Sequence, residues 1–263
     1  MSFTDSHAHL DDERFDPDRE AVLHRAREAG VTRILTIAEA TRPTEVEKTL
    51  LLAAEHDGFL WVAVGVHPHE ARHATDELLD ELASRATQRR LLAWGEIGLD
   101  YHYDHSPRDV QQEVFRKQLQ RARGLDLPVI VHCREAWDDC LRILNEEWGG
   151  AGSPAGILHC FSGTAEVAAR ATAWGFLISF AGTVTFPKAE DLRAAAAAVP
   201  LESLLIETDC PYLAPQAVRG KRNEPAFVVE VAAELGRVRG LTTEEMGKRT
   251  TENFLRLFPR ART

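Results

Sequence analysis

Short apolar runs alternate with helical patterns along the whole chain. Eight runs rich in apolar residues have the length and bounding turns of β-strands: 3–6, 32–37, 60–66, 91–94, 129–131, 156–158, 176–180 and 204–206. The segments between them have helical periodicity. Residues 16–30 end on the helix-stopping Gly30, and residues 106–126 begin with Ser106 and Pro107, which favour a helix start. The pattern therefore predicts repeated strand–helix units.

Several of these runs predict parallel pairing. WVAVGV, PVIVHC and GILHC are apolar at almost every position rather than at alternate ones, which is typical of strands covered on both faces. Eight parallel strands with crossover helices indicate an α/β fold, a TIM-type (β/α)8 barrel, with an open doubly wound sheet as the alternative. Residues 242–258 add a C-terminal helix that could close the barrel.

Length and composition fit one domain. The 263 residues, 44% of them hydrophobic, can form one large barrel, and no linker wide enough to divide the chain interrupts the pattern. The loosest stretch, GGAGSPAG at 149–156, fits a single helix-to-strand loop. We therefore expect one domain over residues 1–263.

The charge balance limits the possible partners. The formal net charge is -10, which argues against a broad basic track along duplex DNA, so a nucleic acid would have to be held locally. The start of the chain lacks the pattern of a secretory peptide, and no later apolar run is long enough to span a membrane. We expect a cytoplasmic protein with no membrane association, and nothing in the sequence indicates an obligatory protein partner.

The segment FTDSHAHLDD carries the first candidate chemistry. His7 and His9 are two residues apart, so on a strand both side chains point to the same face. A pair at this spacing is compatible with metal binding and equally with two surface histidines. The pair alone does not decide between the two.

Other ionisable residues follow most of the predicted strands, where barrel enzymes assemble their sites. The second and seventh strands contribute fewer ionisable residues. The residues at the ends of the other strands are His7 and His9 after the first, His67 after the third, Glu96 after the fourth, His132 after the fifth, His159 after the sixth, and Glu207 and Asp209 after the eighth.

Taken together, these residues predict a metal centre. A histidine at one strand end is more often a hydrogen-bonded core residue than a ligand, but burying the whole set without a cation would be costly. The donors suit Zn, Mn or Mg, and their number exceeds the ligands of one catalytic zinc, which indicates two ions with Glu96 able to bridge them. The predicted ligands are His7, His9, Glu96, His132, His159 and Asp209.

Two further residues could contact substrate. If the substrate is a phosphate ester, we expect His67 and Arg134 to contact its phosphate oxygens or the leaving group, because a guanidinium can bind phosphate through two hydrogen bonds. The alternative for Arg134 is an ion pair with Glu135 or another acid at the rim. His69 and His73 are expected to be exposed loop histidines.

Aromatic residues also follow the ligand-bearing strands. Tyr101, Tyr103, Phe161 and Tyr212 could stack on unpaired bases, and ordinary packing explains them equally well. Asn223 fits helix capping ahead of the last barrel helix almost as well as it fits a functional role.

Seven segments in order resemble one family. DSHAHLDD, GVHPHE, GEIGLDYH, PVIVHCREA, LHCFSGT, ETDCPYLAP and KRNEP are similar to the signature segments of the TatD-type metal-dependent deoxyribonucleases. The resemblance implies a TIM-like barrel that holds one to three divalent ions and acts on DNA, chiefly as a 3′-to-5′ exonuclease on single strands. It also implies that His7, His9 and Asp209 hold one ion, that His132 and His159 hold another, and that Glu96 bridges them.

These residues could hydrolyse a phosphodiester with metal-activated water. In this hypothesis Glu96, Asp209 and His67 are catalytic: Asp209 takes a proton from the attacking water, while Glu207 orients a neighbouring ligand. Single-stranded DNA or a short nucleic-acid end is then the substrate. The alternatives are an amidohydrolase or esterase acting on a small acyl or aminoacyl-tRNA ester, and a metal-binding scaffold without turnover.

Overall fold

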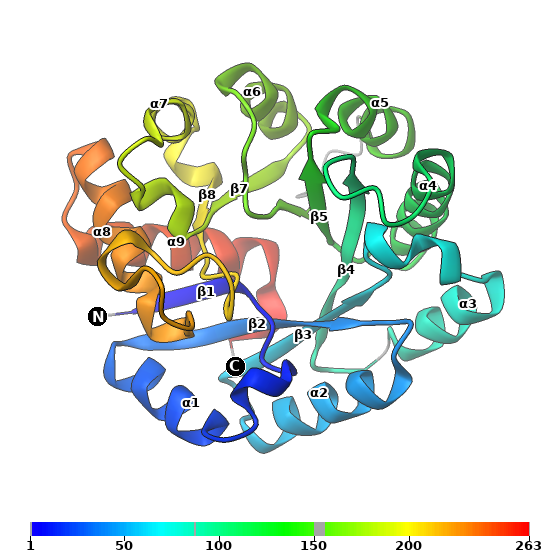
Figure 1. Cartoon of the computed structure of the whole chain (residues 1–263), viewed down its shortest axis with the longest axis horizontal. Coiled ribbons are helices and arrows are strands. Elements are labelled where there is room, and N and C mark those ends of the chain that lie inside the picture. Colours follow the sequence, from blue (N-terminus) through cyan, green and yellow to red (C-terminus); the bar gives the residue numbers. More distant parts are fainter. Residues whose placement is uncertain (1, 87, 150–155, 263) are drawn as a thin grey trace.

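The strands form one parallel sheet in strict chain order. The computed structural model describes residues 2–86, 88–149 and 156–262, so residues 150–155 of the predicted loop lie outside it. The strands run in the order β1 to β8, with every neighbouring pair parallel, and they curve into a barrel (Figure 1). Their bounds are β1 Phe3–Ala8, β2 Val31–Glu39, β3 Leu60–Gly65, β4 Leu91–Asp100, β5 Val129–Arg134, β6 Gly156–Leu158, β7 Phe176–Phe180 and β8 Leu204–Ile206.

Helices surround this barrel on the outside, as crossover connections between parallel strands require (Figure 1). Gly30 follows α1 with φ 87°, the left-handed conformation that glycine adopts without steric penalty. The predicted helix stop is therefore confirmed. The α-helices are α1 Arg19–Glu28, α2 Pro43–Glu55, α3 Asp76–Arg85, α4 Arg108–Gly124, α5 Trp137–Trp148, α6 Ala165–Ala173, α7 Glu190–Ala198, α8 Val228–Arg239 and α9 Thr243–Leu257.

Side chains complete the closure between β8 and β1. A single parallel bridge joins Ala8 to Cys210 just beyond β8. The buried Asp5 carboxyl accepts hydrogen bonds from the Thr208 backbone N–H (2.9 Å) and hydroxyl (2.6 Å). The Ser6 hydroxyl donates to the Ile206 carbonyl (3.0 Å). Buried polar groups thus replace a regular ladder at this seam.

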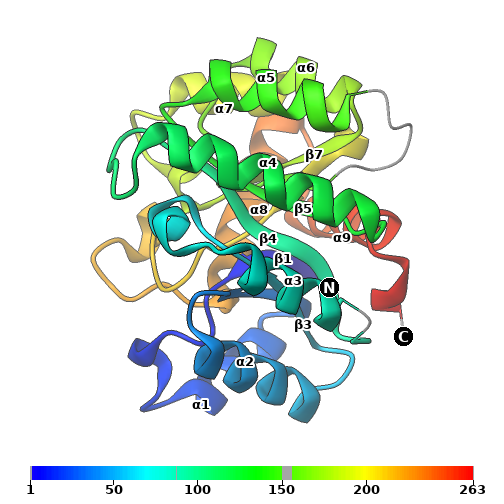
Figure 2. The same ribbon diagram turned by 90° about the vertical axis from the view of Figure 1, so that its right-hand side faces the viewer.

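The C-terminal helix covers one end of the barrel interior. Inward-facing apolar residues of β2 to β8 pack together with Phe254 of α9 and with Phe258 just after it, and both phenylalanines are buried. A capping box formed by Thr242 and Glu245 starts α9. Both chain ends lie on the right-hand side of the molecule in Figure 2. The predicted closing helix over 242–258 is confirmed.

The eight predicted strands and the (β/α)8 barrel are confirmed, and the open sheet is excluded. Several strands run further than predicted: β4 was expected to end at Trp94 and continues to Asp100.

Ser106 does not cap α4; its hydroxyl donates to the His69 carbonyl (2.8 Å) and accepts from the Arg72 N–H (3.1 Å). Within the described ranges, no helix is long and apolar enough to cross a membrane.

Candidate metal centre

The open end of the barrel holds a cavity of about 1190 Å³ that is lined by charged, polar and apolar residues. It lies at the carboxyl ends of the strands, where consecutive strands present different side chains to a common centre. The structure brings the six predicted ligands together here, although they are spread over more than 200 positions of the chain. They are His7, His9, Glu96, His132, His159 and Asp209.

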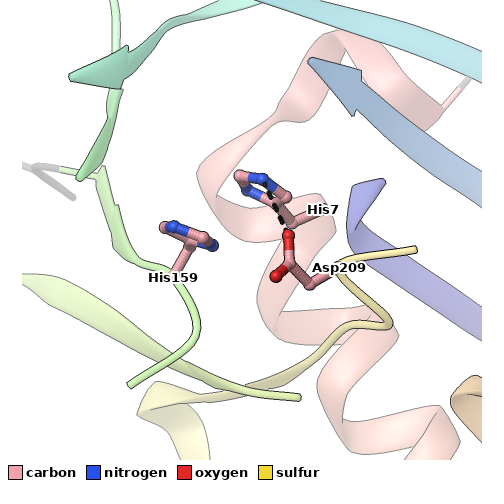
Figure 3. Close-up of side chains that lie close together, drawn as sticks. All are labelled: His7, His159 and Asp209. Carbon is pink, nitrogen blue, oxygen red and sulfur yellow. Dashed lines mark ion pairs between the residues drawn. The ribbon is translucent and has the colours of Figure 1, made fainter. Parts of the chain in front are cut away.

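One carboxylate oxygen of Glu96 faces the β1 side of the centre. Glu96 Oε2 lies 3.3 Å from His7 Nε2 and 3.9 Å from His9 Nε2. The Nε2 atoms of the two histidines are 3.2 Å apart, so both side chains point to the same face, as predicted. Asp209 Oδ1 lies 3.7 Å from His7 Nε2 and 3.4 Å from His9 Nε2. Figure 3 shows the Asp209 carboxylate directed at His7, with His159 beside them.

The other oxygen of Glu96 faces the β5–β6 side. Glu96 Oε1 lies 2.9 Å from His132 Nδ1, 2.6 Å from His159 Nε2 and 3.5 Å from His67 Nε2. Two groups of histidines therefore share one carboxylate, each through a different oxygen. This is the arrangement that a bridging carboxylate between two cations requires.

Electrostatics in the cluster favour cations. Burial raises the pKa of Glu96, but the charges of His159, His67 and His7 outweigh it and hold that pKa well below its usual range. Burial lowers the pKa of His159, which the charge of Glu96 and a hydrogen bond with Glu207 nevertheless raise well above its usual range. Burial lowers the pKa of His9 and His132 as well, but hydrogen bonds and charges of nearby carboxylates raise both above the usual value, so without an ion the protons on His9, His132 and His159 balance the buried carboxylates. A divalent ion can displace such protons.

The donor set fits divalent ions. Three groups bring their ligand atoms within 4.8 Å of one another: His7 with His9 and Glu96, His7 with His159 and Asp209, and His67 with Glu96 and His132. Imidazole nitrogen and carboxylate oxygen are ligands that Zn and Mn accept in common. Glu96 belongs to two of the groups, so the residues fit two ions that share it.

Glu207 lies behind one of the predicted ligands. Its Oε1 lies 3.3 Å from His159 Nδ1 and accepts a hydrogen bond from the Cys160 N–H (2.7 Å), while His159 Nε2 faces Glu96. Metal-binding histidines commonly make such a contact with a carboxylate. Glu207 therefore lies where it can orient His159.

Sequence reasoning missed Asp100 and misplaced His69. Asp100 is buried at the true end of β4, and its Oδ2 lies 3.0 Å from His132 Nε2 and 3.1 Å from His69 Nε2. His69 was expected to be an exposed loop histidine, and it lines the cavity instead. A second H-x-H pair, His67 and His69, was the signal in the sequence. His73 is exposed, as expected, and lies 3.8 Å from Glu70.

Strand two contributes one ionisable residue to the cavity lining, Glu39. Its carboxylate ends β2 and accepts hydrogen bonds from the N–H groups of Thr41 and His67, both at 3.0 Å. Burial raises the pKa of Glu39 to about 7. The sequence analysis did not identify Glu39, because β2 runs two residues further than predicted.

Arg134 lies at the cavity with a free charge. It ends β5, and its guanidinium lies 4.8 Å from the centre of the Tyr103 ring. Glu135, the alternative partner, contacts His102 Nδ1 at 2.7 Å instead. The other cavity-lining cations have acidic partners within 4.0 Å, whereas no described acid pairs with Arg134.

The aromatic candidates divide into two pairs. Phe161 is buried, and the Tyr101 hydroxyl donates to Asp139 at 2.8 Å, so these two are packing residues. Tyr103 and Tyr212 are exposed and line the cavity. Asn223 is buried and does not cap a helix; its amide donates to the carbonyls on both sides of the Asp209 segment.

The chain is similar to known proteins over almost its whole length. The family model described as TatD related DNase matches residues 4–259. The uncharacterized metal-dependent hydrolase YabD of Bacillus subtilis is 43% identical, over 97% of this chain and 98% of its own. The 3′-5′ ssDNA/RNA exonuclease TatD of Pectobacterium parmentieri is 34% identical, over 95% of this chain and 96% of its own.

A solved structure agrees in fold. The crystal structure of YJJV, a TatD homolog from Escherichia coli, superposes with a TM-score of 0.89 at 34% identity, covering 98% of each chain. Sequence and structure thus match over nearly the full length of the described barrel.

Proposed function

The chain belongs to the TatD family of metal-dependent hydrolases, and from this premise we propose that it hydrolyses phosphodiester bonds at single-stranded DNA ends with two divalent ions. We further propose that it removes nucleotides in the 3′-to-5′ direction, the activity named for the relative in Pectobacterium parmentieri. Mg, Mn and Zn are the candidate ions. The ligands proposed are His7, His9 and Asp209 for one ion, His132 and His159 for the other, and Glu96 for both.

The observation that carries this proposal is the position of Glu96. Its two oxygens face separate histidine groups, at 3.3 Å from His7 Nε2 and 2.6 Å from His159 Nε2. Two divalent ions bound by these residues would supply positive charge near the attacking and leaving oxygens of a phosphodiester and would lower the pKa of a water. That chemistry suits a substrate with one negative charge on each phosphate.

Asp209 and Glu207 have separate proposed roles. Asp209 lies at the cavity surface, so its carboxylate can take a proton from the attacking water. Glu207 is fully buried behind His159 and cannot reach substrate. It acts by holding the imidazole so that Nε2 points to the centre.

His67 is suited to donate a hydrogen bond to substrate. Its Nδ1 accepts a hydrogen bond from the His69 N–H at 3.2 Å, so in the neutral imidazole the proton is on Nε2. Burial lowers the pKa of His67 to about 4, which keeps the ring neutral near pH 7. The Nε2–H lies on the cavity side, toward Glu96, where it can contact a phosphate oxygen or the leaving group.

Arg134 supports an anionic substrate. A guanidinium that has no acidic partner at the edge of this cavity is available for phosphate, and it can bind two oxygens at once. The Tyr103 ring beneath it holds the guanidinium in place. A neutral acyl ester would make no use of this charge.

The test begins with protein stripped of metal and resupplied with Mg, Mn or Zn. Single strands labelled at the 5′ end, matching duplexes and a panel of acyl esters are offered as substrates. We expect stepwise shortening from the 3′ end of single strands with at least one metal, and no shortening without metal. Clear ester turnover with no DNA shortening under any metal would overturn the proposal in favour of the acyl-ester hydrolase.

A further inference from the structure

We propose that Tyr103 and Tyr212 stack on unpaired nucleobases on the two sides of the phosphate that is cleaved. This inference rests on the proposed function, and it adds the feature that selects single strands. It concerns two surfaces: the β4-side surface, formed by Tyr103, His105 and Arg134, and the β8-side surface, formed by Tyr212 and Arg14.

Exposure is the first reason. Among the described residues, four large hydrophobic side chains are exposed, and the two aromatic ones are Tyr103 (51%) and Tyr212 (47%). Both line the cavity that contains the candidate metal centre, whereas the exposed leucines, Leu51 and Leu125, do not. Single exposed apolar residues are common on proteins, but the exposed aromatic rings coincide with one site.

The two tyrosines lie on opposite sides of the barrel mouth. Tyr103 follows β4 and Tyr212 follows β8, and in an eight-stranded barrel in chain order these strands are four positions apart. Figure 1 shows β4 and β8 on different sides of the barrel. A strand that crosses the mouth over Glu96 therefore meets one tyrosine before the centre and one after it.

On the β4-side surface, an imidazole ring and a guanidinium group both lie close to the Tyr103 ring. His105 lies parallel to Tyr103, with ring centres 5.6 Å apart and planes 3° apart, and the Arg134 guanidinium lies 4.8 Å from the Tyr103 ring centre. The Asp100 carboxylate accepts the Tyr103 N–H at 2.9 Å, which fixes the loop. Bases stack on aromatic rings and on guanidinium planes alike.

The β8-side surface is built on a rigid backbone. The amide of buried Asn223 donates to the Tyr212 carbonyl at 2.6 Å, and the Tyr212 N–H donates to the Asp209 carbonyl at 3.0 Å. The Arg14 guanidinium lies 4.3 Å from the ring centre and is neutralised by a two-point ion pair with Asp12. This side thus offers an aromatic face with a balanced charge.

Tyr212 lies beside a proposed metal ligand, and Tyr103 lies beside a histidine that contacts the same carboxylate as one. The Tyr103 ring lies 5.4 Å from the ring of His69, which shares the Asp100 oxygen with His132. The Tyr212 ring lies 5.9 Å from the ring of His9. A phosphate at the centre would therefore have a stacking surface within reach of the nucleotide on either side.

Charge explains why stacking is needed. The chain carries a net charge of -10, and the cavity cations other than Arg134 are paired with acids, so general attraction to a polyanion is weak. Stacking adds about tenfold or more in affinity for each base and does not depend on sequence. Bases in a duplex are stacked on one another, so only unpaired bases can use these surfaces.

The test compares two single strands of equal length, one with normal bases and one in which the bases near the 3′ end are replaced by abasic sites. The metal-loaded full chain and its variants Y103A, Y212A, Y103F and Y212F are assayed on both. We expect the wild type to have a kcat/KM about tenfold or more higher for the strand with bases. Each alanine variant lowers that ratio several-fold, mainly through KM, and each phenylalanine variant keeps it.

Leu51→Ala, an exposed apolar change on α2 outside the cavity, is the matched control and keeps the wild-type ratio. A wild-type ratio near one, or a ratio that falls in only one of the two alanine variants, would overturn the two-sided proposal while leaving the phosphodiesterase assignment intact. Failure of the wild type to cleave either strand would instead overturn the proposed function, and this inference with it.

Discussion

The two ends of the barrel interior are built from opposite kinds of side chain. At the end covered by α9, buried apolar residues such as Trp61, Ile130 and Phe254 fill the space. At the other end, buried histidines and carboxylates face one another across a cavity. The same strands supply both ends, so a few residues along a strand separate a region that stabilises the fold from one that is costly to bury without ions.

This contrast predicts which changes affect which property. Apolar packing at the α9 end contributes to stability through area removed from water. The polar end gains little stability from its buried charges unless cations join them. Changes at the α9 end should therefore lower the free energy of unfolding, whereas changes at the polar end should mainly alter metal binding and catalysis.

The largest expected effect is on Glu96. Glu96→Gln keeps the shape of the side chain but removes the charge that the two histidine groups share, so we expect activity to fall by on the order of a thousandfold. Steady-state cleavage of a single strand measures the activity, and elemental analysis measures the bound metal, which should also fall. Circular dichroism should show an unchanged fold. Activity within tenfold of the wild type would contradict the shared-carboxylate role.

The second largest expected effect is a loss of stability at the end of the barrel covered by α9. Phe254 is fully buried, and its ring centre lies 4.8 Å from that of Phe258. Phe254→Ala should lower the free energy of unfolding by about 3–5 kcal/mol, because it leaves a cavity between α9 and the strands. Urea unfolding measures this loss. The KM of the folded fraction should match that of the wild type. A changed metal affinity would show that the α9 end and the polar end of the barrel are not independent.

A smaller effect is expected at Asp100. Asp100→Asn replaces an oxygen that two imidazole Nε2 atoms share, so His132 is no longer held with Nδ1 toward Glu96. We expect about 10- to 100-fold weaker binding of one of two metal ions. Calorimetric titration of metal-free protein with Mn or Zn measures each site. Asp104→Asn, an exposed position in the same loop, is the control; equal weakening of both sites by Asp100→Asn would contradict the local role.

The smallest expected effect is the contribution of Glu39 to the pH dependence of stability. Burial raises the pKa of Glu39 to about 7 from an ordinary value of 4.5. The folded state therefore holds a proton that the unfolded state releases, and the stability this gives is present below pH 4.5 and is lost as the pH rises to 7. Thermal melts from pH 5 to 8 should show a pH-dependent loss, of no more than about 3 kcal/mol, that is smaller in Glu39→Gln. Identical pH profiles would rule out this titration.

The fold could be predicted because the apolar runs and the helices between them follow one repeated pattern. The ends of the strands could not. In β4 the segment after Trp94 contains Gly95, Glu96 and Gly98, which break the apolar pattern, yet the strand continues to Asp100 because these positions face the cavity or a neighbouring strand. A hydrophobic pattern stops where a site begins, so Asp100 was missed.

Long-range polar contacts were also beyond sequence reasoning. Asp5 and Thr208 close the barrel with a hydrogen bond across 203 positions, and neither residue has a local pattern that indicates the other. The expectation that residues at the strand ends lie together did locate the six proposed ligands in one place, because the carboxyl ends of all strands of a parallel barrel lie at the same end.

The most direct test of the shared carboxylate is anomalous diffraction from crystals grown with Mn or Zn. We expect two peaks about 3.5–4 Å apart, one on each side of Glu96, with the first beside His7 and His9 and the second beside His132 and His159. A single peak, or peaks that do not contact Glu96, would contradict the account.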